Sequence, residues 1–119
     1  MGMYVNARAH LKAGCHLMFL TMTLLAAAAL GAEPEFAITL HNHKFEPAEI
    51  NVPAGVRVKL VIENQDSSAE EFDSFALNRE KIIFPNAKGI VFVGPLKPGR
   101  YEFIGEFNRE SAHGALIAQ

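Results

Sequence analysis

The stretch Val56-Arg57-Val58-Lys59-Leu60-Val61-Ile62-Glu63 decides the fold class of this 119-residue chain. Its apolar residues recur at every second position, and the three charged residues fall on the alternate positions. Successive side chains of a β-strand point to opposite faces, so this pattern buries one face and leaves the other in water. The stretch therefore predicts a half-buried strand of a sheet that packs on one side only.

Shorter segments of the same kind lie on both sides of this stretch. Two turns, Val52-Pro53-Ala54-Gly55 and Leu96-Lys97-Pro98-Gly99, combine a proline with a later glycine, as tight turns require. No stretch after residue 32 has helical periodicity. Short strands separated by turns predict an all-β sandwich of about seven to eight strands. The further strands are expected at residues 36–40, 49–52, 72–77, 81–84, 89–93, 99–104 and 115–118.

The first 32 residues have the composition of a secretory signal peptide. Arg8 and Lys12 precede an apolar run over residues 17–30, and the small residues Gly31 and Ala32 follow it. The run is shorter than the roughly 20 apolar residues that a membrane-spanning helix needs. We therefore expect export to the periplasm and cleavage near residue 32, which leaves a single domain of residues 33–119 that does not span the membrane. A retained N-terminal anchor is the alternative.

Charge and cysteine content restrict what the exported domain can do. All 13 acidic residues lie after residue 32, but only 9 of the 11 basic residues do, so the domain carries a net charge of −4 with neutral histidines. This charge gives no electrostatic basis for binding nucleic acid. The only cysteine, Cys15, lies in the predicted leader, so the domain has neither a disulfide nor a thiolate ligand. No nucleophile-elbow or phosphate-binding motif indicates an enzyme.

Taken in order, the segments resemble the cupredoxin family. The matching pattern consists of Phe45-x-Pro47-x-x-Ile50-x-Val52-Pro53-Ala54-Gly55, Val58-x-Leu60-x-Ile62-x-Asn64-x-Asp66, Pro98-Gly99-x-Tyr101-x-Phe103 and Gly114-x-Leu116. The resemblance covers nearly all of residues 33–119 and implies a cupredoxin-like Greek-key sandwich.

A more specific resemblance is to the cupredoxin-like periplasmic proteins that accompany bacterial iron-permease uptake systems. It is carried by Glu70-Glu71-Phe72-x-Ser74, Arg79-Glu80-Lys81, Gly94-Pro95-Leu96-Lys97-Pro98-Gly99 and Gly105-Glu106-Phe107. This resemblance implies an accessory role in iron or copper uptake. It also implies an inner-membrane iron permease, or a periplasmic protein associated with one, as the partner.

The chain lacks the ligands of a blue-copper centre. Such a centre holds copper with two histidines, one cysteine thiolate and usually a weak axial methionine. The resemblance places these four ligands at Glu71, Gly105, Asn108 and Ala112 of this chain. None of the four residue types is right, so the sequence excludes a type-1 centre. The histidines of the iron-uptake subgroup correspond to Phe75 and Asn108, which weakens the case for that metal site as well.

Another set of residues could still bind a metal at one end of the sandwich. Strand direction places residues 41–48 and the segment after residue 64 at the same end, and the family fold adds residues 105–113. Imidazole suits copper, zinc or iron, and carboxylates suit iron or manganese. We therefore expect a weak, exchangeable copper or iron site, with Asn108 as an additional ligand, formed by His43, Glu71, Glu106 and His113.

The alternative interpretation assigns no metal to these residues. His41 and His43 follow a strand end, Glu70 and Glu71 adjoin in a polar segment, and His113 precedes a glycine. All of these are places where charged side chains are commonly exposed to solvent. The domain would then be a metal-free β-sandwich that acts as a protein-interaction module of a periplasmic or membrane complex.

Overall fold

The strand predicted from the alternating stretch is β4 (Val58–Asn64), which lies inside a four-stranded sheet. Its residues alternate between buried and half-buried positions along the whole strand. β1 (Glu35–His41) pairs with it in parallel on one side, and β7 (Lys88–Val93) pairs with it in antiparallel on the other. The alternation of charge and apolar character in the sequence therefore decides which face of β4 meets the core.

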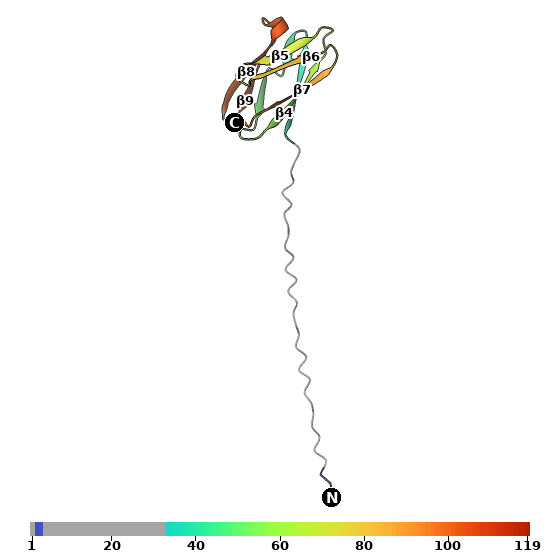
Figure 1. Cartoon of the computed structure of the whole chain (residues 1–119), viewed down its shortest axis with the longest axis vertical. Coiled ribbons are helices and arrows are strands. Elements are labelled where there is room, and N and C mark those ends of the chain that lie inside the picture. Colours follow the sequence, from blue (N-terminus) through green and yellow to red (C-terminus); the bar gives the residue numbers. More distant parts are fainter. Residues whose placement is uncertain (1, 4–32) are drawn as a thin grey trace. The chain divides into compact units, whose positions relative to one another are not determined.

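Two sheets form the sandwich in this computed structural model, which describes residues 2–3 and 33–119 (Figure 1). The first sheet has the order β2-β1-β4-β7 and the second has the order β3-β9-β8-β5-β6. The all-β sandwich is confirmed, with nine strands in the described residues. The remaining elements are β2 (Lys44–Glu46), β3 (Glu49–Val52), β5 (Glu70–Ser74), β6 (Arg79–Ile83), β8 (Gly99–Gly105), β9 (His113–Ala118) and a single 3₁₀ turn, η1 (Glu106–Asn108).

The additional strand, β2, comes from a hairpin that the sequence pattern did not reveal. His41 pairs with Lys44, so only Asn42 and His43 lie in the connecting loop. Both loop residues have positive φ, 50° and 59°, as a two-residue type I′ hairpin requires. Asparagine and histidine both adopt this conformation more readily than most residues, but without a glycine the pair is a weak sequence signal for such a turn.

Three aromatic rings form the centre of the core between the sheets. Phe103 lies 4.9 Å from Phe72 and 5.1 Å from Phe45, measured between ring centroids. All three side chains are buried, and they come from β8, β5 and β2. Gly114 on β9 leaves room for this cluster, because a Cβ atom there would overlap the Phe103 ring. Without a disulfide, the domain depends on this packing.

Strand directions define an apical end of the sandwich. β1, β4, β6 and β8 end there, and β5, β7 and β9 begin there. The apical end includes Glu70 at the start of β5, Gly105 at the end of β8, and η1, which lies at the opposite end of the sandwich from the C-terminus (Figure 1).

The predicted leader falls outside the part of the chain that the structure describes, apart from Gly2 and Met3. The domain boundary at residue 32 and the export of the protein therefore remain predictions. Within the described residues, no helix is long and apolar enough to cross a membrane.

Candidate functional site

β5 begins at Glu70, two residues earlier than the pattern predicted, and this changes which glutamate faces the interior. Glu70, Phe72 and Ser74 are buried, whereas Glu71 and Asp73 are only half-buried. Because side chains alternate along a strand, Glu70 points into the sandwich and Glu71 points to the outer face of the second sheet. Two adjacent carboxylates, of which only Glu71 was predicted to bind a metal, therefore occupy opposite environments.

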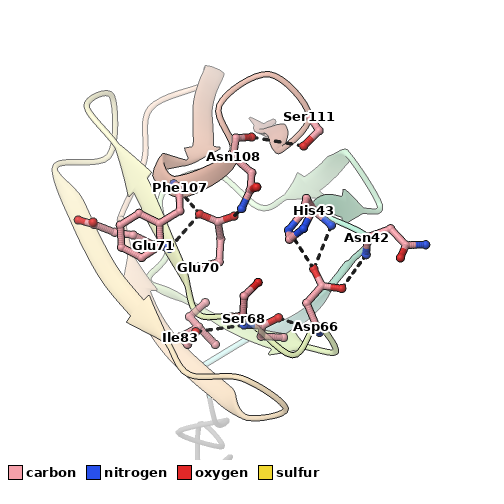
Figure 2. A network of polar contacts seen from close by, with 11 residues as sticks. Asn42, His43, Asp66, Ser68, Glu70, Glu71, Ile83, Phe107, Asn108 and Ser111 are labelled. Atoms are coloured by element: carbon pink, nitrogen blue, oxygen red, sulfur yellow. Dashed lines mark hydrogen bonds and ion pairs between the residues drawn. The ribbon is translucent and has the colours of Figure 1, made fainter.

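The Glu70 carboxylate is buried and accepts three hydrogen bonds. Only 1% of the residue is exposed. Its Oε1 accepts from the backbone N–H groups of Phe107 (2.8 Å) and Glu71 (3.1 Å), and its Oε2 accepts from Nδ2 of Asn108 (2.6 Å) (Figure 2). None of the ion pairs found among residues 33–119 includes Glu70. The three donors therefore offset the high cost of burying a carboxylate.

Gly105 and Ala112 close the space around this carboxylate. A Cβ atom on Gly105 would lie 2.6 Å from the Cβ of Ala112 and 2.7 Å from the Cδ of Glu70. The backbone N–H of Gly105 donates to the carbonyl of Ala112 at 2.9 Å, which closes the loop between β8 and β9. Gly105, Asn108 and Ala112 thus meet at one point, and the glutamate that meets them is Glu70 rather than Glu71.

The residues at this point do not fit the copper ion of a blue-copper centre. That ion needs imidazole and thiolate ligands. Gly105 and Ala112 provide no donor atom, and Asn108 provides only an amide, whose nitrogen already donates to Glu70. Both carboxylate oxygens of Glu70 already accept hydrogen bonds. The place that the resemblance assigns to the metal is filled by protein atoms.

The four residues predicted to bind a metal are spread over the apical end. Glu106 forms a short ion pair with Arg109 (2.6 Å), Glu71 lies on the outer face of β5, and His113 is exposed at the start of β9. His43 lies in the β1–β2 turn. Among residues 33–119, no three His, Cys, Asp or Glu side chains are close enough together to hold a metal ion. Metal binding by these residues therefore stays a prediction that requires side-chain movement.

Glu71 nevertheless lies in a negative electrostatic environment. Its pKa is raised by partial desolvation and then by the charges of Glu80, Asp73, Glu106 and Glu70. Asp73 on β5 lies directly opposite Glu80 on β6. A cation on this outer face of the second sheet would reduce the repulsion among these carboxylates.

His43 is engaged by a different carboxylate, Asp66, in the loop after β4 (Figure 2). Asp66 accepts the backbone N–H groups of Asn42 (2.8 Å) and His43 (2.9 Å), and Nδ1 of His43 lies 3.5 Å from its Oδ2. Desolvation alone would raise the pKa of Asp66, but these hydrogen bonds and the charges of His43 and His41 outweigh it and lower the pKa. These contacts of Asp66 hold the β1–β2 turn in place. No sequence motif indicated the contacts.

Comparisons with known proteins agree with this architecture. Residues 14–118 match the family model described as the cupredoxin-like domain. A protein of Rickettsia prowazekii (strain Madrid E), "Uncharacterized protein RP394", is 37% identical over 107 residues, covering 85% of this chain and 86% of that protein.

Solved structures of copper proteins share the fold at low sequence identity. The metal-binding domain of the Streptococcus pneumoniae D39 Cu(I)-exporting P-type ATPase CopA is 16% identical with a TM-score of 0.64, covering 71% of this chain and 84% of that one. Auracyanin A, a blue copper protein of Chloroflexus aurantiacus, is 14% identical with a TM-score of 0.64, covering 74% and 100%. Given the sandwich and the family match over residues 14–118, this chain belongs to the cupredoxin-like domain family.

Proposed function

We propose that this chain is a periplasmic accessory protein of iron or copper uptake that acts by contacting a partner protein and holds no copper at the cupredoxin centre. The partner that the sequence resemblance suggests is an inner-membrane iron permease, or a periplasmic protein that works with one. The domain would then keep the cupredoxin fold and act by contacting the partner through its apical surface, without a metal ion at the cupredoxin centre.

One observation carries this proposal. The buried Glu70 carboxylate fills the point where Gly105, Asn108 and Ala112 meet, and both of its oxygens accept hydrogen bonds from the protein itself. Next to it, η1 exposes Phe107, whose side chain is 53% accessible. Glu70 fixes the loop that carries this exposed aromatic ring. A ring held in this way is suited to contact with another protein.

The first test is calorimetric titration of the chain with cuprous, cupric, ferrous and ferric ions at micromolar concentrations. We expect no ion to bind at the cupredoxin centre, because neither Gly105 nor Ala112 has a donor atom and the Glu70 oxygens are already occupied. Binding that Glu70→Ala or Asn108→Ala abolishes would contradict the proposal, because it would place the ion at that centre.

The second test addresses the partner directly. A photo-crosslinking residue in place of Phe107 should crosslink to a co-expressed iron permease. The matched control replaces Phe75, which is fully exposed (101%) in the turn after β5, at the opposite end of the strand from Glu70. We expect at least a several-fold higher yield from position 107. Equal yields from both positions, or none from either, would contradict contact through the apical end.

A second candidate function is supported by the raised pKa of Glu71. In this case a copper or iron ion binds to Glu71 and Glu106 on the outer face of the second sheet, with His43 and His113 as further ligands after side-chain movement. The same titration distinguishes it. Binding that both Glu71→Ala and Glu106→Ala weaken, and that the exposed control Glu46→Ala leaves unchanged, would favour this surface site over a metal-free domain.

A further inference from the structure

We propose that Glu70 is a carboxylate latch that does the structural work of a metal ion, holding the loop between β8 and β9 in place so that the apical end is ordered without metal. The inference is independent of the proposed function, because it follows from the contacts of Glu70 whatever partner the domain has.

The latch joins segments that are far apart in the sequence. Its bonds to the Phe107 N–H and the Asn108 side chain cross separations of 37 and 38 residues. The carbonyl of Asn108 then accepts the backbone N–H groups of Ala112 (2.8 Å) and Ser111 (3.1 Å). Through Asn108, the latch therefore connects the start of β5 with both η1 and the start of β9. In a cupredoxin metal centre, ligands from separate segments make this kind of connection through the ion.

The other hydrogen bonds and the ion pair described for residues 105–112 join residues of the loop to one another. η1 has no side-chain cap at its N-terminus and buries none of its own residues. The N–H of Phe107 is one of the donors that a helix start leaves without an internal partner, and Glu70 accepts it. Gly105 offers no side chain, and the buried methyl group of Ala112 offers only packing. Glu70 is therefore the side chain outside the loop that joins it to β5 by hydrogen bonds.

An exchange of the two partners tests the latch. Asn108→Asp places two carboxylates face to face with no donor between them. The double variant Glu70→Gln with Asn108→Asp only swaps the amide and the carboxylate. Its new amide at position 70 can donate to the new carboxylate at position 108, while the carbonyl of that amide still accepts from Phe107. The double variant also restores the original net charge, so a recovery cannot be attributed to overall charge.

The measurement is hydrogen exchange of the full-length chain, comparing the amides of residues 105–112 with those of β4. For Asn108→Asp we expect roughly tenfold or faster exchange in the loop, and for the double variant most of the original protection. The matched control is Ser74→Ala, which removes the other buried polar side chain on the same face of β5. It should leave exchange in residues 105–112 unchanged, because its hydrogen bonds go to Glu102 and Leu77.

Adding or removing metal tests whether the Glu70 carboxylate holds the loop without a metal ion. In the original chain, neither a chelator nor added cupric ion should change protection of residues 105–112. If Asn108→Asp does not fold, Asn108→Ala removes the donor without adding charge and should show a smaller rise in exchange confined to the loop. Unchanged exchange in a folded Asn108 variant, no recovery in the double variant, or a loop that becomes protected only when metal is added would each overturn the latch. A metal ion bound at Glu71 and Glu106 would instead favour the second candidate function and leave the latch intact.

Discussion

Replacing Phe72 with alanine should lower the free energy of unfolding by about 3–5 kcal/mol, the range for truncating a buried aromatic side chain. Phe72 is fully buried between the sheets, and its ring lies against Phe103 (4.9 Å between centroids) and Phe45 (6.3 Å). The large loss is expected because a sandwich cannot easily collapse around a gap at the centre of three interlocked rings.

This loss is large relative to the stability of the whole domain. At roughly 0.05–0.15 kcal/mol per residue, residues 33–119 would have a total stability of about 4–13 kcal/mol. The Phe72→Ala variant should therefore unfold at a much lower urea concentration, or be unfolded at the start, as monitored by circular dichroism.

A control for Phe72 lies three residues further along the chain. Phe75 is fully exposed, so Phe75→Ala should change the free energy of unfolding by less than about 0.5 kcal/mol. If Phe72→Ala cost less than about 1 kcal/mol, or if the two variants behaved alike, the aromatic cluster would not be the centre of the core.

Most of the fold could be predicted from the sequence because period-two patterns survive in the strands that bury one face. β4 and β8 alternate apolar side chains with mostly polar ones, β7 is an apolar run after Lys88, and the predicted ranges of all three agree with the structure to within two residues. β2 was missed because its three residues follow a two-residue turn that contains no glycine. A pattern of alternation needs more than three residues before it can be distinguished from a loop.

The start of β5 was missed for a different reason, and this affected the site. Glu70 and Glu71 are adjacent acidic residues, and composition alone suggests an exposed loop for both. The alternation Glu70-x-Phe72-x-Ser74 was the available signal that Glu70 shares the inward face with Phe72. The donors that make such burial acceptable, the Phe107 N–H and Asn108, lie 37 and 38 residues away, and only the fold brings them together.

Restoring a cysteine at position 105 should destabilise the domain without creating a blue-copper centre. Gly105 has ordinary extended dihedral angles, φ −91° and ψ 107°, so a side chain there causes no backbone strain. The obstacle is space, because a Cβ atom would lie 2.6 Å from the Cβ of Ala112 and 2.7 Å from the Cδ of Glu70. Forcing extra atoms into a packed site costs about 1–3 kcal/mol, and here it would also push the carboxylate away from Asn108.

Two measurements check this expectation. Urea unfolding should show that Gly105→Cys and Gly105→Ala lose similar amounts of free energy, because the clash comes from the Cβ atom that both variants share. Addition of cupric ion to Gly105→Cys should give no intense visible absorption of the thiolate–copper kind, because the two imidazole ligands are still missing. Full stability of both variants would show that the contacts among Glu70, Gly105 and Ala112 are looser than they are in the structure.

The expected cost at Gly105 also explains why a metal centre cannot be restored by one substitution. Glu70 and Asn108 satisfy each other, and Gly105 and Ala112 are small enough to make room for them. A cysteine at position 105 conflicts with the carboxylate, and a histidine at position 70 alone would leave the Phe107 N–H without its acceptor. We therefore expect thiolate–copper absorption only when positions 70, 105 and 108 change together to histidine, cysteine and histidine. Absorption from Gly105→Cys alone would contradict this expectation. It would mean that a metal ion easily displaces the Glu70 carboxylate, and that the carboxylate blocks the metal centre only weakly.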